Sequence, residues 1–454
     1  MKTIDVGYVI DEGRWTTYQK LLILGAALTI ILDGVDNQLL GNAVPSLMKE
    51  WSLPRGAFST ILALSPFGMM IGGAVGGILG DRIGRRTALL FSMLSFAVLT
   101  LAISTVNGLM LLGAFRFLAG LGLGGAMPNA AALSSEYVPR RQRPFAVTLT
   151  IVCIPLGGTL AAFLSAWILP IYGWRTLFVL GGIIPIALAI LLFKVLPESP
   201  RYLASRRERW PELIALLRRL GHDTPADANF VEAGAGHVQQ SRASMRDLFV
   251  PQFRRDTLGL FGSFFFCLLV NYVGILLLVA TLTGAGFSQP AASNALGWWN
   301  IGGVAGAVVG ALIIQRFGSR ITMLGLSALA IASGFIVAAM PLDPQSVPLL
   351  LMLILLGGTL NAVQTTMYAL AANVYPTEIR GTGIGTAVAV GRIGNVLASY
   401  TGNFALDLAG PPAYFSSFAI GMVIVFISLS VIRRHIGSSV TEVAAVRVGV
   451  PAGR

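Results

Sequence analysis

The stretch GGILGDRIGRR, residues 76–86, decides the fold class of this 454-residue chain. Its first half closes an apolar segment, and its second half places a single acid, Asp81, among Arg82, Arg85 and Arg86. Another apolar segment follows at once. Arginine and lysine gather in the short cytoplasmic connectors of membrane proteins. The stretch is therefore expected to be a cytoplasmic connector between two membrane-spanning helices.

Apolar segments of this kind recur along the whole chain. Hydrophobic residues make up 55% of the sequence and charged residues 11%, less than half of the roughly 25% usual in soluble domains. Each segment is long enough to cross a hydrocarbon core of ~30 Å as a helix, and the short alternating segments of a β-barrel are not visible. We expect twelve spans, at 21–43, 57–79, 88–105, 109–131, 145–168, 175–196, 257–282, 292–314, 321–340, 347–371, 383–407 and 413–432.

The positive charge follows the predicted topology. The net charge is +12, but the basic residues lie in the connectors between apolar segments, so the lipid bilayer is the expected partner and nucleic acid is not. With a cytoplasmic N-terminus, only Lys49, Arg55 and Arg175 of the 32 lysines and arginines fall in outer connectors. An odd number of spans would destroy this asymmetry, so both termini are expected in the cytoplasm.

The two halves of the chain echo each other. Residues 81–86 follow the second predicted span, and residues 315–320, QRFGSR, follow the eighth at an offset of 234. A second correspondence, at an offset of 237, matches Pro139 and Arg143 with Pro376 and Arg380. These offsets indicate a duplicated six-span unit. Membrane transporters are often built from such repeats and hold their substrate near the bilayer midplane between them.

The predicted organisation has five parts. They are an N-terminal cytoplasmic segment 1–20, a six-helix bundle 21–196, a cytoplasmic linker 197–256, a second six-helix bundle 257–432 and a cytoplasmic tail 433–454. Within the linker, residues 211–220 have the pattern of a short amphipathic helix, which we expect to lie on the cytoplasmic surface.

The connectors resemble those of the major facilitator superfamily, whose first signature, Gly-x-x-x-Asp-Arg-x-Gly-Arg-Arg, ends at Arg86. Its second signature, on the fourth span, appears as Arg116 followed by Gly120, Gly122 and Gly124. The resemblance implies an all-α polytopic membrane protein, with twelve transmembrane helices in two pseudo-symmetric six-helix bundles. The second-half connector departs from the pattern at Gln315 and Ser319, so a symmetric pair of gating loops is not implied.

A narrower resemblance is to the aromatic acid:proton symporters of bacteria. It rests on Asp33-Gly34-Val35-Asp36 in the first span, Gly391-Arg392 in the eleventh, and Pro-Glu-Ser-Pro-Arg at 197–201. The resemblance implies a monomer in the bacterial cytoplasmic membrane that imports a benzoate-like or hydroxybenzoate-like acid with a proton, without cofactor, metal or enzymatic activity. Alternatives are a symporter for a dicarboxylate or nicotinate-like anion, a proton-driven exporter and a ligand sensor.

Asp33, Asp36 and Arg116 are the predicted proton-coupling residues. At ~1.5 Å per residue, Asp33, Arg116 and Arg392 lie about 15, 11 and 14 Å from the nearer ends of their spans, and a charge at that depth is costly. Asp36 shares a helix face with Asp33. We expect Asp33, Asp36 and Arg116 to load and release a proton, because a nearby guanidinium and a dry setting shift a carboxyl pKa in opposite directions. The alternative is a permanent pair that only fixes helix packing.

Arg392 is the predicted substrate residue of the second half, because its planar charged fork suits a carboxylate. The alternative is an arginine that binds backbone carbonyls. Aromatic and amide side chains are expected to contact the ring, and they are Asn271, Tyr272, Asn361, Gln364, Tyr368 and Trp298. Trp298 lies near the outer end of its span, where tryptophans often act as interfacial anchors instead.

The connectors supply the predicted gate. Its residues are Asp81, Arg82, Arg85, Arg86, Glu136, Arg143 and Arg380. Asp81 favours gating over orientation by charge alone, since an acid among cations adds nothing to orientation. Glu136 is expected to pair with Arg140 or Arg143, and Arg380 is the second-half counterpart of Arg143.

Overall fold

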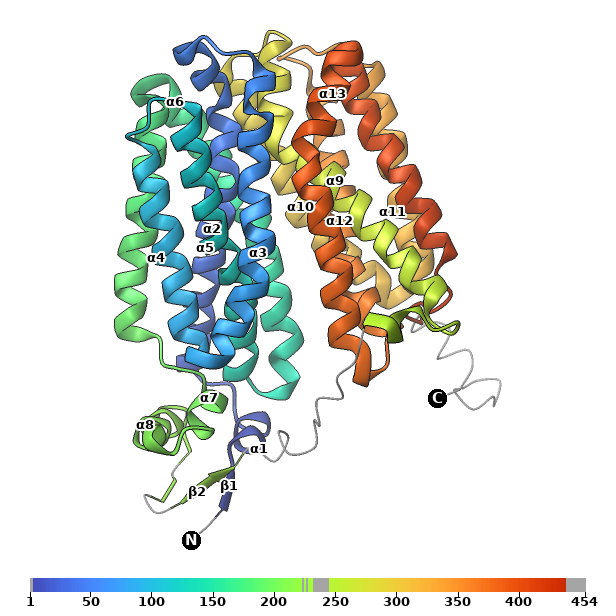
Figure 1. Ribbon diagram of the computed structural model, residues 1–454. Coiled ribbons are helices and arrows are strands. Elements are labelled where there is room, and N and C mark those ends of the chain that lie inside the picture. The colour runs from blue at the N-terminus through green and yellow to red at the C-terminus, as the bar shows by residue number, and fades with distance from the viewer. Residues whose placement is uncertain (1–2, 223, 226–227, 232–244, 438–454) are drawn as a thin grey trace. The chain divides into compact units, whose positions relative to one another are not determined.

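The computed structural model describes residues 3–222, 224–225, 228–231 and 245–437, and these are mostly helical (Figure 1). Residues 232–244 of the predicted linker and residues 438–454 of the predicted tail lie outside the described residues. The elements are β1 (Thr3–Asp5), α1 (Val6–Asp11), α2 (Thr17–Trp51), η1 (Arg55–Phe58), α3 (Ser59–Ile83), α4 (Arg85–Ile103), α5 (Leu109–Tyr137), η2 (Arg140–Gln142), α6 (Arg143–Val195), α7 (Pro200–Ala204), η3 (Arg207–Arg209), α8 (Trp210–Arg219), β2 (Asn229–Val231), η4 (Met245–Phe249), α9 (Arg254–Gly284), α10 (Gln289–Phe317), α11 (Ser319–Ala339), α12 (Val347–Val374) and α13 (Thr377–Val431), where η marks a 3₁₀ helix.

Among the described residues, ten helical stretches are long and apolar enough to span a membrane. Two of them contain a turn: α6 breaks at Gly173, with φ of 76°, and α13 breaks at Ala409 and Gly410. Divided at these turns, they give twelve apolar segments, which matches the predicted number. These apolar segments are helical because lipid offers no hydrogen-bond partners, and a helix pairs its backbone groups within one segment.

The described residues form two compact units. Unit 1 comprises the described residues within 1–37, 68–157 and 175–241, and unit 2 comprises those within 38–67, 158–174 and 242–454. Helices α2, α3 and α6 contribute residues to both units, so unit 2 contains α9–α13 together with one end of α2, one end of α3 and the middle of α6 around its turn. The predicted division into two bundles at the linker stays a prediction.

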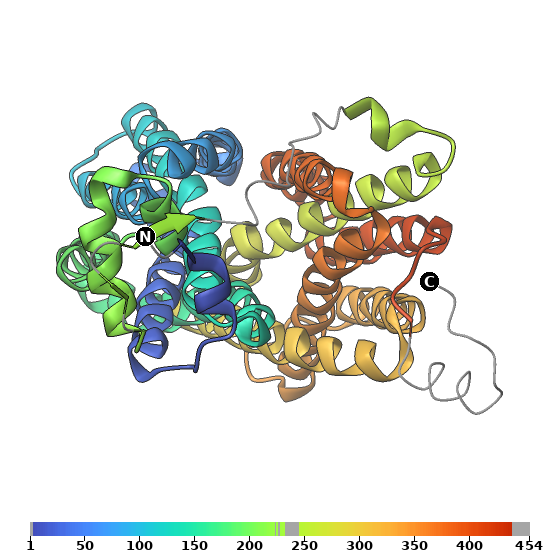
Figure 2. The same cartoon turned by 90° about the horizontal axis from the view of Figure 1, so that it is seen from below.

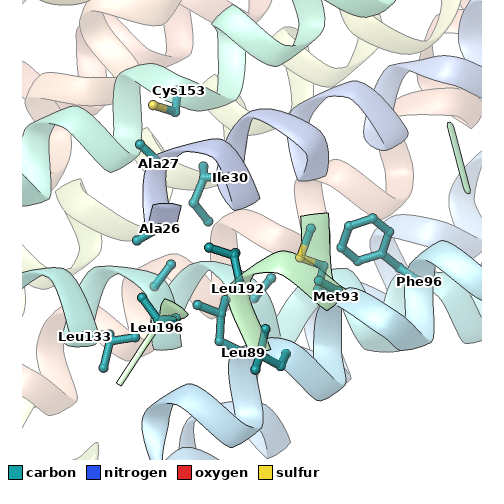
Figure 3. Packing of buried hydrophobic residues seen from close by; sticks show 14 of the residues in the cluster. Ala26, Ala27, Ile30, Leu89, Met93, Phe96, Leu133, Cys153, Leu192 and Leu196 are labelled. Atoms are coloured by element: carbon teal, nitrogen blue, oxygen red, sulfur yellow. The ribbon is translucent and has the colours of Figure 1, made fainter. Parts of the chain in front are cut away.

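Small and branched side chains fill the core of unit 1 (Figure 3). Ala26 and Ile30 of α2 lie one turn apart and face Leu89 and Met93 of α4 in one buried cluster. Residues three and four apart share a helix face, so this spacing produces a continuous apolar stripe. Leu192 of α6 is also buried in this cluster.

Helices α3 and α5 cross at a distance that only glycine allows. A Cβ at Gly72 would lie 2.0 Å from the carbonyl oxygen of Leu121, and one at Gly76 would lie 2.4 Å from the Cα of Gly125. Close backbone approach through small residues drives helix association in membranes, where lipid offers no hydrophobic contrast. The glycines of α3 therefore set the spacing of these two helices.

The N-terminal segment and the linker form a small separate core beneath the helices of unit 1 (Figures 1 and 2). Strand β1 pairs in parallel with β2, joining Thr3 to Asn229. The apolar face of α8, with Leu213 and Leu217, packs in this core against Val6 of α1. The predicted amphipathic helix at 211–220 is therefore present as α8, but its apolar face packs on protein and not on lipid.

The duplicated connectors have the same backbone conformation. Gly84 lies between α3 and α4 with φ of 102°, and Gly318 lies between α10 and α11 with φ of 77°. Both angles fall in the region that favours glycine. The two positions differ by the 234 residues of the sequence repeat, so the repeat recurs in the structure of these corners.

We predict that Gly72→Leu separates α3 from α5 and prevents stable folding, because the new side chain meets backbone atoms that cannot move aside. The measurement is the yield of monodisperse protein in detergent and its midpoint of thermal unfolding. Gly77→Leu is the matched control, since a Cβ there has nothing within 4 Å. Equal yield and midpoint for both variants would contradict the close crossing.

Candidate functional site

A buried ion pair joins three helices of unit 1. Asp36 of α2 is 0% exposed and Arg116 of α5 is 1% exposed. The Arg116 Nη1 lies 3.1 Å from Asp36 Oδ2, and the Thr100 hydroxyl of α4 donates to Asp36 Oδ1. Both carboxylate oxygens therefore have a partner, as a buried charge requires.

Asp33 lies one turn before Asp36 on α2 and is 4% exposed. Both acids are thus buried in unit 1. A proton taken up by Asp36 would remove the negative charge that attracts Arg116 and that accepts from the Thr100 hydroxyl. Protonation there would consequently change how α2 contacts α4 and α5.

The predicted gate residues of the first connector converge on Glu136 and Glu198. Arg85 lies 2.5 Å from Asp81 and 3.9 Å from Glu136. The Ser199 hydroxyl donates to the other oxygen of Glu136. Glu136 therefore contacts Arg85 and Ser199, and its expected pairing with Arg140 or Arg143 stays a prediction.

Glu198 follows α6 in the chain and is buried against the first turn of α4, although the sequence analysis did not include it among the site residues. Its Oε1 accepts from the backbone N–H of Arg86 at 2.9 Å, and its Oε2 accepts from the Thr87 hydroxyl at 3.3 Å. The first turn of a helix carries free N–H groups and a partial positive charge, so it favours an anion. The sequence feature that could have indicated Glu198 is its position between Pro197 and Pro200, at the end of an apolar segment.

Arg143 pairs with Asp11, the last residue of α1, and its Nε donates to the carbonyl of Ser135 at 3.1 Å. Arg380, its counterpart in unit 2, is exposed and donates its Nε to the carbonyl of Tyr375 at 3.3 Å. Both arginines thus bind a carbonyl at the end of the preceding long helix, where a positive charge is favourable. Arg82 is exposed, and its carbonyl accepts from the Tyr202 hydroxyl.

Unit 2 brings together three of the predicted ring-binding amides. The Asn271 amide nitrogen of α9 donates to Gln364 and, at 3.4 Å, to Asn361, both on α12. Asn361 also donates to the Gly357 carbonyl at 3.0 Å. Within the described residues, the Asn271 Oδ1 has no hydrogen-bond partner although it is buried.

The remaining predicted substrate residues occupy different surroundings within unit 2. Tyr368 lies one turn beyond Gln364 on α12 and packs edge-on against Phe264, while Arg392 of α13 is half-buried. Tyr272 is buried beside Asn271 on α9. Trp298 is 41% exposed and lines a recess of about 300 Å³ with Phe287 and Asp343, apart from the amides.

Comparison with known proteins identifies the family of the chain. The sequence model of the Major Facilitator Superfamily matches residues 26–399 and 259–448. The chain is 34% identical to the gallate transporter of Pseudomonas putida, over 92% of this chain and 94% of that one. It is 32% identical to the 4-hydroxybenzoate transporter PcaK of Pseudomonas aeruginosa, over 90% and 91%, and 30% identical to the benzoate transport protein of Acinetobacter baylyi, over 94% and 93%.

Solved structures share the fold. The xylose transporter XylE from E. coli, in an inward open conformation, superposes with a TM-score of 0.70 at 18% identity, covering 94% of this chain and 99% of that one. A D-xylose-proton symporter gives a TM-score of 0.68 at 18% identity, covering 92% and 99%. The predicted fold of twelve transmembrane helices in this superfamily is confirmed.

We predict that Arg116→Leu destabilises the protein by about 3–5 kcal/mol, because it leaves the Asp36 carboxylate buried without its cation. The midpoint of thermal unfolding in detergent measures the loss. The double variant Asp36→Leu, Arg116→Leu should be more stable than either Asp36→Leu or Arg116→Leu alone, since apolar replacement of both partners leaves no bare charge. A double variant whose loss equals the sum of the two single losses would show that the pair is not coupled.

Proposed function

Because the chain belongs to the Major Facilitator Superfamily and is a transporter, not an enzyme, we propose that it imports a small aromatic carboxylate together with a proton. The membrane would be the bacterial cytoplasmic membrane, with both termini inside. The observation that carries the proposal is the burial of Asp33, Asp36 and Arg116 in a chain whose relatives transport gallate, 4-hydroxybenzoate and benzoate.

The proton would use the acids of α2. Charged residues at membrane depth mark ion and proton pathways in transporters. Among described residues, the histidines lie near helix ends, at His222 beyond α8 and His435 beyond α13, so neither can serve as a relay at the depth of Asp33. Release of Arg116 from Asp36 would accompany proton uptake and shift α5 against α2, which links protonation to a change of conformation.

The substrate carboxylate would bind Arg392 of α13. On α12, Gln364 lies one turn before Tyr368, a rise of ~6 Å, and it accepts from the Asn271 amide of α9. A phenolic hydroxyl both donates and accepts, so it could donate to the unpartnered Asn271 Oδ1 and accept from the Gln364 amide. This chemistry favours hydroxylated rings over benzoate itself.

We predict that purified protein in liposomes accumulates 4-hydroxybenzoate, gallate or benzoate when the outside is made acidic, because inward proton flow drives symport. Labelled substrate inside the liposomes is the measurement, with nicotinate and succinate as competitors. Accumulation driven by the reversed gradient would indicate an exporter. Uptake of succinate but none of the aromatic acids would contradict the substrate class.

The variant Asp33→Asn separates binding from coupling in the same assay. An amide cannot release the proton, so substrate should still equilibrate across the membrane but no longer accumulate. Normal uphill accumulation by this variant would remove Asp33 from the coupling role. Asp343→Asn is the control, since Asp343 lies in the exposed connector between α11 and α12.

We predict that Arg392→Lys raises the KM for uptake at least about tenfold, because a compact ammonium cannot reproduce the two-pronged contact of guanidinium with carboxylate. Concentration dependence of the initial uptake rate measures the change. Arg320→Lys, at an exposed arginine of α11, should leave KM unchanged. An unaltered KM for Arg392→Lys would place the substrate carboxylate elsewhere.

A further inference from the structure

A reciprocal amide pair crosses between the two sequence repeats inside unit 2. The Gln38 Nε2 of α2 donates to the Asn300 Oδ1 of α10 at 3.1 Å, and the Asn300 Nδ2 donates to the Gln38 Oε1 at 2.9 Å. Gln38 is 3% exposed and Asn300 is 1% exposed. Each amide thus satisfies the other in a region where water does not reach either side chain.

The pair occupies a niche that a third helix leaves open for it. A Cβ at Gly158 of α6 would lie 2.1 Å from the Gln38 Nε2 and 3.0 Å from the Asn300 Nδ2. Any side chain at position 158 would displace the amides. Three helices therefore meet at this pair, and two of them come from the first repeat.

A second set of bonds joins the same repeats further along the helices. The Arg55 Nη2 binds Asp407 at 2.6 Å, and its Nε donates to the Asn403 Oδ1 at 2.7 Å. On α10, Gln289 donates to the Asn42 carbonyl at 2.9 Å and accepts from the Ser46 hydroxyl at 2.8 Å. All these contacts lie on the far side of Gln38 from the N-terminal end of α2, the end that the charge pattern places in the cytoplasm.

The buried and exposed contacts contribute unequally. The Asp407 side chain is 68% exposed and that of Arg55 is 25% exposed, so solvent and salt screen their attraction and the pair contributes little. The buried amides have no such competitor. Removing one of them leaves the other without a partner, which costs more than an average hydrogen bond gains.

We propose that Gln38 and Asn300 form a latch that holds the outer end of the transport pathway shut, and that opening to the outside requires this pair to separate. Transport by repeats that rock about a central site demands that contacts between the repeats at one end break while those at the other form. The strength of this amide pair therefore sets the fraction of protein that is open outward. The inference does not depend on the substrate.

A cysteine introduced by Ser293→Cys reports on opening. Ser293 lies between Gln289 and Asn300 at helical spacing on the same face of α10, is 0% exposed, and its hydroxyl has no hydrogen-bond partner within the described residues. The two native thiols, both free and buried, are removed by Cys153→Ala and Cys267→Ala. The rate of reaction with a membrane-impermeant maleimide added outside intact cells, without substrate, is measured.

We expect Gln38→Leu or Asn300→Leu to raise this rate about tenfold, because each leaves one buried amide unpaired in the closed arrangement. The exchanged variant, Gln38→Asn with Asn300→Gln, keeps both amides and their summed length and should react at close to the parental rate. Asn294→Leu, at an exposed amide of the same helix, is the control and should change nothing.

Three outcomes would overturn the latch. One is an unchanged rate in both leucine variants. Another is an exchanged variant as reactive as the single ones, which would show that packing at these positions matters and pairing does not. The third is a reaction rate that stays unchanged with maleimide added outside the cell and rises only when the maleimide is supplied from the cytoplasmic side. If a leucine variant fails to fold, Gln38→Asn alone shortens the pair and should raise the rate by a smaller factor.

Discussion

A polar group that is buried among the helices of a membrane protein must find its partner within the protein, since lipid offers none. Three of the pairs that meet this demand join helices or connectors far apart in the sequence. Asp36 binds Arg116 and Thr100, Glu198 binds the beginning of α4, and Gln38 binds Asn300. Each pair therefore specifies which helices adhere and in which register.

Apolar surfaces alone could not give that specificity. Leucine and isoleucine pack against lipid tails nearly as well as against another helix, so close packing depends on glycines such as Gly72 and Gly76. A smooth glycine face lets helices approach, and a polar pair fixes them at one position. A transporter needs both properties, because its helices must move and must also stop in defined arrangements.

The sequence predicted what depends on neighbouring residues. Continuous apolar runs gave the spans, and the repeated corner around Gly84 and Gly318 is found in the backbone. The burial of Asp33, Asp36 and Arg116 was also predictable, because a charge within an apolar run has nowhere else to lie. Their roles in coupling, like those of Arg392 and the amides in binding, remain proposals.

Partners far apart in the sequence were not predictable. Asp11 lies 132 residues from Arg143, and Gln38 lies 262 residues from Asn300. Amides in apolar runs carry no charge to draw attention, and an amphipathic pattern such as that of α8 does not reveal whether lipid or protein covers it. Leu213 and Leu217 pack on the N-terminal segment, which only the folded chain could show.

The most direct test of proton coupling uses proteoliposomes that contain no substrate, suspended in a weakly buffered medium with no gradient imposed. The external pH is measured when 4-hydroxybenzoate is added. If the buried acids carry a proton with each substrate, the outside becomes more alkaline at a rate that follows substrate entry. Entry of labelled 4-hydroxybenzoate with no accompanying change of external pH would contradict coupling through Asp33 and Asp36.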